Sequence, residues 1–199
     1  MVELAAPHVR FRRSYLTAYD EFVAAGEEHY VKVLSWPADE KFPGREYTRE
    51  SLESPEVFSG FAAFVVDQRL PGSPRPAHFV PYTELWMVDG DEYVGRIALR
   101  HELTELLLTW GGHIGYSVRP SARRRGHAGA ALGLMLPVCA ELGIDPVLVT
   151  CDTDNEASRR TIERNGGVYE DTRQGKLRYW VPTRPALPLE AGQARAAAR

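Results

Sequence analysis

Three consecutive arginines, Arg123 to Arg125, are followed by the small-residue run Gly126 to Gly129, and this segment could do chemistry. The preceding residues 113–118, HIGYSV, have the composition of a strand, and residues 131–143, ALGLMLPVCAELG, that of an apolar helix. A short loop at a helix N-terminus leaves backbone N–H groups unpaired, and the helix dipole favours negative charge there. We therefore expect a phosphate-binding loop in which the main-chain N–H groups of residues 124–129, His127 among them, face an anion.

Two common nucleotide-binding motifs are absent from this loop. A P-loop needs GxxxxGK[ST], and no Lys-Ser or Lys-Thr step follows a glycine here. A dinucleotide-binding GxGxxG is also missing, because Gly126 is followed by Ala128 and Gly129. The usual nucleotide folds are thus disfavoured.

The elements around the loop predict one β-α-β unit over residues 113–151. Residues 146–151, PVLVTC, form a short apolar run without alternation, which is typical of a strand buried on both faces. Downstream, residues 152–167 should contain a helix that is capped at its start by Asp154 or Asn155 and is stopped by the glycine pair 166–167. Pro137 predicts a kink in the apolar helix, whose nearly uniform apolar surface predicts that it is covered on all sides.

Two hairpins and two more helices complete the predicted elements. The hairpins join 83–89 to 92–100 across an Asp-Gly turn, and 168–173 to 176–182 across Gln174-Gly175. In 92–100, we expect Tyr93, Gly95, Ile97 and Leu99 to share an apolar face. Amphipathic helices are expected at 13–25, with Val23 in its buried stripe, and at 57–69. We also expect a weak strand near the N-terminus and a surface loop at 35–47.

The bulk composition indicates one globular domain. The chain has 199 residues, 44% of them hydrophobic, and a formal net charge of −3, which does not favour a nucleic-acid-binding surface. Cys139 and Cys151 lie in apolar runs without a CxxC pair, so we expect reduced core residues. No signal peptide or membrane-spanning run is apparent, and we expect a cytoplasmic protein with no membrane or nucleic-acid partner. The domain should span 1–183, followed by a mobile tail at 184–199.

The segment Arg123-x-x-Gly126-x-Ala128, after the step Val118-Arg119-Pro120 and before Asn155, resembles the acyl-CoA-binding core of the GCN5-related N-acetyltransferases. The resemblance covers residues 82–180. Within the family, this segment is similar to a bacterial branch of predicted acetyltransferases. It implies an α/β fold with a central mixed, mostly antiparallel sheet, a splayed parallel strand pair and helices on both faces. Residues 1–81 would then lie on the acceptor side, and 82–183 would form the donor-binding core.

The resemblance also implies contacts with acetyl-CoA as the acyl donor. The backbone near Ser117 and Val118 would bind the thioester carbonyl and stabilise the oxyanion. The backbone of 124–129 would hold the pyrophosphate, with Arg123, Arg124 and Arg125 adding charge-assisted bonds. Asn155 would contact the donor arm, although a helix N-cap is its commoner role.

The resemblance leaves the proton-transfer residues open. The attacking amine must be neutral, so a base or a water chain must take its proton. His113 lies near the position of a common family glutamate and is one candidate base; a structural hydrogen bond is the alternative. Glu84 and Glu102 are the competing bases.

The family tyrosine that protonates the departing thiolate is replaced here by Ile162. Ser158, one turn earlier, or Tyr169 could take its place, or the thiolate could leave unassisted. We expect no acyl-enzyme, because neither cysteine has an activating neighbour in the sequence.

These observations predict an N-acetyltransferase that uses acetyl-CoA to modify a primary amine of a small molecule or peptide in a ternary complex. A non-catalytic acyl-CoA-binding sensor is the alternative. No metal is predicted, because the HExxE run at 101–105 lacks the second histidine of HExxH. A homodimer is possible, and the acceptor is not determined by the sequence.

Overall fold

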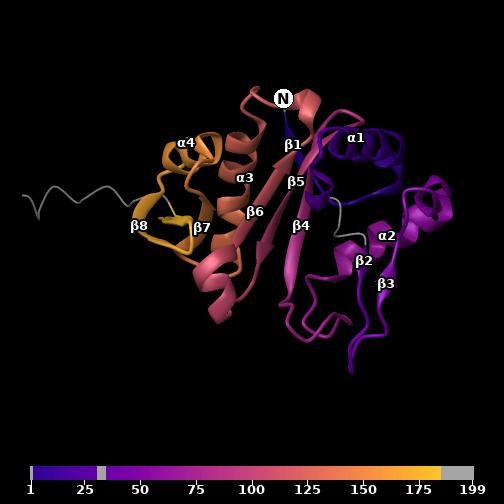
Figure 1. Ribbon diagram of the computed structural model, residues 1–199, viewed down its shortest axis with the longest axis horizontal. Helices are drawn as coiled ribbons and strands as arrows, with labels where there is room; N and C mark the ends of the chain where they lie inside the picture. The colour runs from indigo at the N-terminus through magenta and orange to yellow at the C-terminus, as the bar shows by residue number, and fades with distance from the viewer. Residues whose placement is uncertain (1, 31–34, 185–199) are drawn as a thin grey trace, which may run out of the picture.

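The computed structural model describes residues 2–30 and 35–184. Its main sheet has seven strands in the order β1-β4-β5-β6-β7-β9-β8 (Figure 1). Their bounds are β1 Glu3–Ala5, β4 Tyr82–Asp89, β5 Glu92–Arg100, β6 Ile114–Val118, β7 Val147–Asp152, β8 Val168–Arg173 and β9 Lys176–Val181. Neighbours pair antiparallel except β6 and β7, so the expected α/β fold with a mostly antiparallel sheet is confirmed.

The parallel pair is held together at one end only. β6 and β7 have a single residue pair in register, Ile114 with Val149, whereas β5 and β6 have five. Beyond Ile114, the edge of β6 that faces β7 therefore lacks a strand partner. The predicted splayed pair is present, and it opens toward the end of β6 that leads into the arginine loop.

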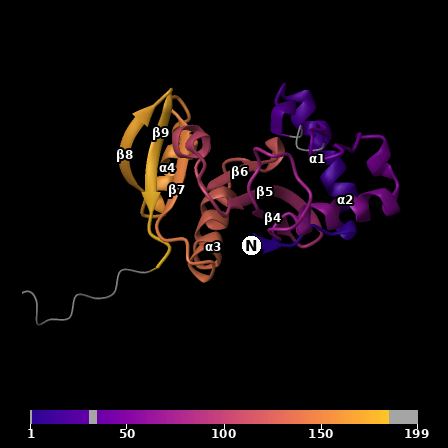
Figure 2. The ribbon, with the colours of Figure 1, turned by 90° about the horizontal axis from the view of Figure 1, so that it is seen from below.

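One face of the sheet is covered by α3 (His127–Glu141) and α4 (Glu156–Arg164). Both views place these two helices on the same side of the sheet, away from α1 and α2 (Figures 1 and 2). The core on this face consists of aliphatic side chains, including Ile97, Ile114, Leu132, Met135 and Ile162. Burial of these side chains is the main force that fixes the start of α3 against β6.

The opposite face is covered by α1 (Arg12–Ala24) and α2 (Pro55–Asp67) through an aromatic cluster. Tyr15 of α1 stacks on Trp86 of β4 with ring centroids 5.0 Å apart. Phe58 and Phe61 of α2 contact the same two rings edge-on or tilted. The helices predicted at 13–25 and 57–69 are therefore confirmed to within two residues, and helices lie on both faces.

The structure corrects the predicted faces of β5. A register shift between Met87 and Val88 leaves Val94 as an extra residue. Tyr93 consequently packs with the α1–α2 cluster, while Val94 packs with Ile97 on the α3 side. A bulge of this kind reverses the side-chain alternation, and a strict period of two could not predict it.

Three further expectations need correction. α3 is not covered on all sides, because Leu134 is 47% exposed and only a stripe with Leu132 and Met135 is buried. Val23, expected in the buried stripe of the first helix, is also exposed. The expected loop at 35–47 contains a short ribbon, β2 (Ser35–Trp36) paired with β3 (Arg45–Glu46).

The remaining elements agree with the sequence. Both hairpins are present, α4 begins after Asn155, and Cys139 and Cys151 are buried free thiols. The expected tail lies outside the described residues, except for Arg184. No helix in 2–30 or 35–184 is long and apolar enough to cross a membrane.

Candidate functional site

The loop between β6 and α3 presents a row of free backbone donors. The N–H groups of residues 124–129 have no hydrogen-bond partner in the part of the chain that the structure describes. Arg124 and Gly126 have left-handed backbone, with φ of 62° and 81°. An added Cβ at Gly126 would meet no atom within 4 Å, so the glycine serves the backbone conformation rather than a close contact. Turns of this kind bring successive N–H groups toward one point and bind anions.

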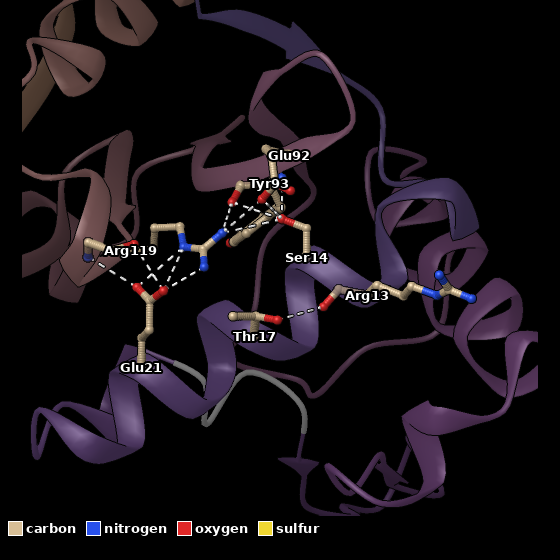
Figure 3. Close-up of polar contacts among 8 residues, drawn as sticks. Arg13, Ser14, Thr17, Glu21, Glu92, Tyr93 and Arg119 are labelled. Atoms are coloured by element: carbon tan, nitrogen blue, oxygen red, sulfur yellow. Dashed lines mark hydrogen bonds and ion pairs between the residues drawn. The ribbon is translucent and has the colours of Figure 1, made fainter.

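The start of this loop is fixed by an ion-pair network around Arg119 (Figure 3). Glu21 of α1 accepts bonds from Arg119 Nη2 at 2.5 Å and from the backbone N–H and hydroxyl of Ser121 at 3.0 and 2.9 Å. Arg119 Nη1 also donates to the carbonyl of Tyr93 at 3.1 Å. Burial alone would raise the pKa of Glu21, but these bonds outweigh it and lower the pKa to about 2. The network joins α1, β5 and the loop.

Arg123 is engaged within the protein rather than free for a phosphate. Its guanidinium forms an ion pair with Glu27, and its Nε donates to the carbonyl of Val118 at 3.1 Å. The bonds to Glu27 lower the pKa of that carboxyl. Arg123 therefore shapes the loop, whereas Arg124 and Arg125 are exposed and have no ion-pair partner in the described ranges.

The strand β6 directs two main-chain groups toward the opening beside β7. Arg100 N–H donates to the carbonyl of His113, so in this antiparallel pair Gly115 and Ser117 also turn their main chain toward β5. The main chain of Tyr116 and Val118 then points toward β7, where the strands have separated. The Val118 carbonyl is bonded to Arg123. Tyr116 N–H replaces Ser117 as the candidate donor to a thioester carbonyl, beside that of Val118.

Asn155 and Ser158 occupy the first turn of α4. The Asn155 side chain accepts the Ser158 N–H at 3.0 Å, so it caps the helix, which is its commoner role. The Ser158 hydroxyl lies 2.7 Å from the hydroxyl of Tyr116, which reaches it from β6. Ile162 is fully buried in the core, and Tyr169 lies on β8 with its hydroxyl 2.8 Å from that of Thr172. Tyr116 was not predicted as a site residue, although its alternation with Ile114 and Val118 in the sequence places these three side chains on one face of β6.

His113 is buried and bonded on both sides of its backbone and through its ring. Its Nδ1 accepts the Leu148 N–H at 2.9 Å, its N–H donates to the Leu148 carbonyl, and its carbonyl accepts from Arg100. Burial and the nearby Arg100 charge lower the pKa of His113 to about 4. The neutral ring keeps its proton on Nε2, because Nδ1 is the acceptor. A proton-accepting role would require the bond to Leu148 to break.

Glu84 is also committed to structural bonds. Its carboxylate accepts from Arg96 at 2.8 Å and from the Trp86 indole at 3.2 Å, and only 6% of its side chain is exposed. Glu102 follows β5 outside the sheet and is exposed. None of the three candidate bases therefore offers a free, positioned lone pair beside β6.

The arrangement as a whole is a sheet that opens at one parallel pair, with free backbone donors on the strand and in the loop that follows it. A family model described as "Acetyltransferase (GNAT) domain" matches residues 19–168. The chain therefore belongs to the GNAT acetyltransferases.

Solved structures share the fold at low sequence identity. RimJ of Mycobacterium smegmatis, in complex with CoA-disulfide, has a TM-score of 0.59 and 17% identity, covering 99% of this chain and 88% of its own. The microcin C7 self-immunity acetyltransferase MccE, in complex with acetyl-CoA and AMP, has a TM-score of 0.56 and 12% identity over 91% and 92% of the two chains. PaiA N-acetyltransferase of Thermoplasma acidophilum, in complex with coenzyme A, has a TM-score of 0.53 and 12% identity over 92% and 99%. A search of the curated proteins finds no match to this sequence.

Proposed function

We propose that this protein transfers the acetyl group of acetyl-CoA to a primary amine of a small molecule or peptide, within a ternary complex. The observation that carries the proposal is the row of unpaired N–H groups at 124–129, continuous with the open edge of β6. The donor's pyrophosphate would bind this row, with Arg124 and Arg125 adding charge, and its extended arm would follow the edge of β6. Structures of the relatives RimJ, MccE and PaiA contain CoA or acetyl-CoA, which supports this choice of donor.

The acyl step needs a donor to the developing oxyanion. The amine nitrogen attacks the thioester carbon, a carbon–nitrogen bond forms and the carbon–sulfur bond breaks. The N–H of Tyr116, aided by that of Val118, would stabilise the negative charge on the carbonyl oxygen. Such a fixed backbone donor is worth roughly 10²–10³ in rate.

Ser158 would protonate the departing thiolate. As the serine gives its proton to the sulfur, the Tyr116 hydroxyl 2.7 Å away would pass its own proton to the serine oxygen, and the phenolate would then regain a proton from water. Burial, which raises the pKa of Tyr116 to about 12, keeps this phenol protonated. Tyr116 thus acts through Ser158, in place of the tyrosine that Ile162 replaces.

The amine would reach the site neutral, and after the attack its nitrogen would give one proton to water and keep the other in the amide. His113 and Glu84 are occupied by Leu148 and Arg96, so neither supports a side-chain base. The pH midpoint of kcat/KM should then follow the pKa of the acceptor amine when acceptors of different basicity are compared. A midpoint that stays constant across acceptors would indicate a protein base instead.

Calorimetry and thiol release test the proposed function together. Acetyl-CoA and CoA should bind the protein, and a panel of primary amines should include acceptors that release free thiol at a rate above solvent hydrolysis. If neither acetyl-CoA nor CoA binds, the proposal is overturned. Binding without thiol release from any amine would support the alternative of a sensor.

A further inference from the structure

Arg100, the last residue of β5, carries a charge that no carboxylate neutralises in the described part of the chain. Its Nη1 donates to the carbonyls of Gly111 and Gly112 at 3.0 and 3.2 Å. Arg96 lies four residues earlier in β5, on the same face of the sheet. Its charge, unlike that of Arg100, is neutralised by Glu84. A half-buried guanidinium next to another arginine, without an anion, is electrostatically unfavourable.

The guanidinium lies over β6 close to the open edge. A Cβ placed on Gly115 would be 3.6 Å from both Nη1 and Nη2 of Arg100, so the absent side chain leaves room for this group. Gly115 immediately precedes Tyr116, whose N–H is the proposed oxyanion donor. Arg100 therefore lies beside the place where the thioester would react.

The position of Arg100 separates it from the donor's phosphates. The guanidinium of Arg100 lies over Gly115, whereas the phosphate-binding loop follows Val118, three residues later. At a rise of about 3.3 Å per residue, the two sites are roughly 10 Å or more apart. Arg100 also lies on the face of Glu84 and Arg96, opposite the core that contains α3. An anion bound there would belong to the acceptor.

The guanidinium of Arg100 has N–H groups that make no hydrogen bond within the described residues. Nη1 makes both of the bonds to the glycine carbonyls, while Nε and Nη2 have no partner among the described residues. Neither atom is fully buried, so both keep some contact with solvent and could donate to a ligand. A structural cap for the carbonyls at the end of the π-helical turn Leu107–Gly111 would use Nη1 alone.

We propose that Arg100 binds an anionic group of the acceptor, a carboxylate or a phosphate, so that the preferred substrate carries a negative charge near its reactive amine. This inference rests on the proposed function and adds a substrate class to it. Bidentate or paired N–H bonds from a guanidinium to an oxyanion are among the stronger polar contacts in proteins. The charge of the acceptor would supply the counter-ion that the fold lacks.

The test compares matched acceptors: amino acids of increasing chain length, the corresponding amino amides, and aminoalkyl phosphates. The wild-type protein should favour the best anionic acceptor over its neutral counterpart by about tenfold or more in kcat/KM. Arg100→Gln should abolish this preference, by lowering kcat/KM for the anionic acceptor about tenfold more than for its neutral counterpart. Arg100→Lys should keep part of it, and Arg69→Gln, an exposed control in the segment after α2, should keep all of it. The carboxylate and phosphate arms identify which anion is bound.

Equilibrium binding of the same acceptors to the protein–CoA complex gives a readout that does not depend on transfer. Wild-type protein should bind the anionic acceptor more tightly than Arg100→Gln by the same factor. Equal affinities, or a preference that survives in Arg100→Gln, would overturn the inference while leaving acetyl transfer intact. Thermal unfolding of each variant separates loss of anion binding from loss of the carbonyl cap.

Discussion

The hydroxyl groups of Tyr116 and Ser158 lie 2.7 Å apart and join β6 to the first turn of α4. β6 forms one edge of the opening in the sheet, and α4 directly follows β7, which forms the other edge. In such a pair, one hydroxyl can give its proton to a leaving group while it stays hydrogen-bonded to the other. A lone serine has no second hydroxyl for this purpose.

Ser158→Ala should lower kcat by about 100-fold with little change in acceptor KM, since general acid catalysis typically contributes 10²–10⁴. Tyr116→Phe should lower kcat by about tenfold, because Ser158 keeps its own proton but loses its donor. Thiol-release kinetics measure both. Unchanged kcat in Ser158→Ala would show that the thiolate leaves unassisted.

Gly126→Ala should weaken CoA binding by a factor of about 5–30, because a left-handed backbone costs a non-glycine residue about 1–2 kcal/mol. The space around Gly126 is open, so the effect would come from the backbone alone. Gly60→Ala in α2, where a Cβ also meets nothing and φ is not positive, is the matched control and should bind CoA normally. Calorimetry gives the CoA affinity of each variant. Equal affinities for Gly126→Ala and Gly60→Ala would show that the left-handed backbone of the loop does not contribute to CoA binding.

Glu21→Gln should lower the free energy of unfolding by about 2 kcal/mol, because a charge-assisted network to a largely buried arginine is weakened. Denaturant unfolding at neutral pH measures the loss. Glu156→Gln, which removes exposed pairs on α4, is the control and should change stability little.

Glu21 should also make the stability of the protein depend on pH in the acid range. The pKa of Glu21 is about 2 in the folded protein and near 4.5 in a free chain. Its stabilisation is therefore present above about pH 4.5 and declines as the pH falls toward 2. Glu21→Gln should lose less stability than the wild type over this interval, and a parallel decline of the two would contradict the assignment.

His113→Asn should make stability less dependent on pH between about 6.5 and 4. The folded-state pKa is about 4, below the ordinary value of 6.5, so protonation favours the unfolded chain as the pH falls through this range. Asn Oδ1 can accept the Leu148 N–H in place of Nδ1 and does not titrate. If transfer activity survives in this variant while the pH dependence of stability is reduced, the role of His113 is structural.

Local features of the fold were predictable because local chemistry dictates them. The Asp89-Gly90 turn fixes one hairpin, and the buried stripe around Tyr15 and Phe22 fixes α1. The place of the arginine loop, between a strand and an apolar helix, followed from the change of hydrophobic period alone. The extra residue in β5 was not predictable, because a bulge depends on how two strands settle against different cores.

The candidate site was less predictable, because its side-chain partners come from distant parts of the chain. Three arginines in a row look equivalent in the sequence, yet Glu27 engages Arg123 and leaves Arg124 and Arg125 without an ion pair in the described structure. His113 and Glu84 were suitable bases by residue type. In the structure, His113 Nδ1 accepts a hydrogen bond from Leu148 and the Glu84 carboxylate accepts one from Arg96. The main-chain groups of β6 that face the opening are those that do not bond to β5. The pairing of the two strands decides which residues these are, and the sequence of β6 alone does not show it.

The ion pair between Arg119 and Glu21 spans 98 positions of the chain. During synthesis, α1 must wait for β4, β5 and β6 to emerge before its carboxylate meets the arginine at the end of β6. Contacts of such long separation form late and slow folding, because loop closure precedes any gain from them. The donor loop should therefore acquire its shape near the end of folding, so that a nascent chain lacking β6 can hold its aromatic N-terminal cluster together but cannot bind CoA.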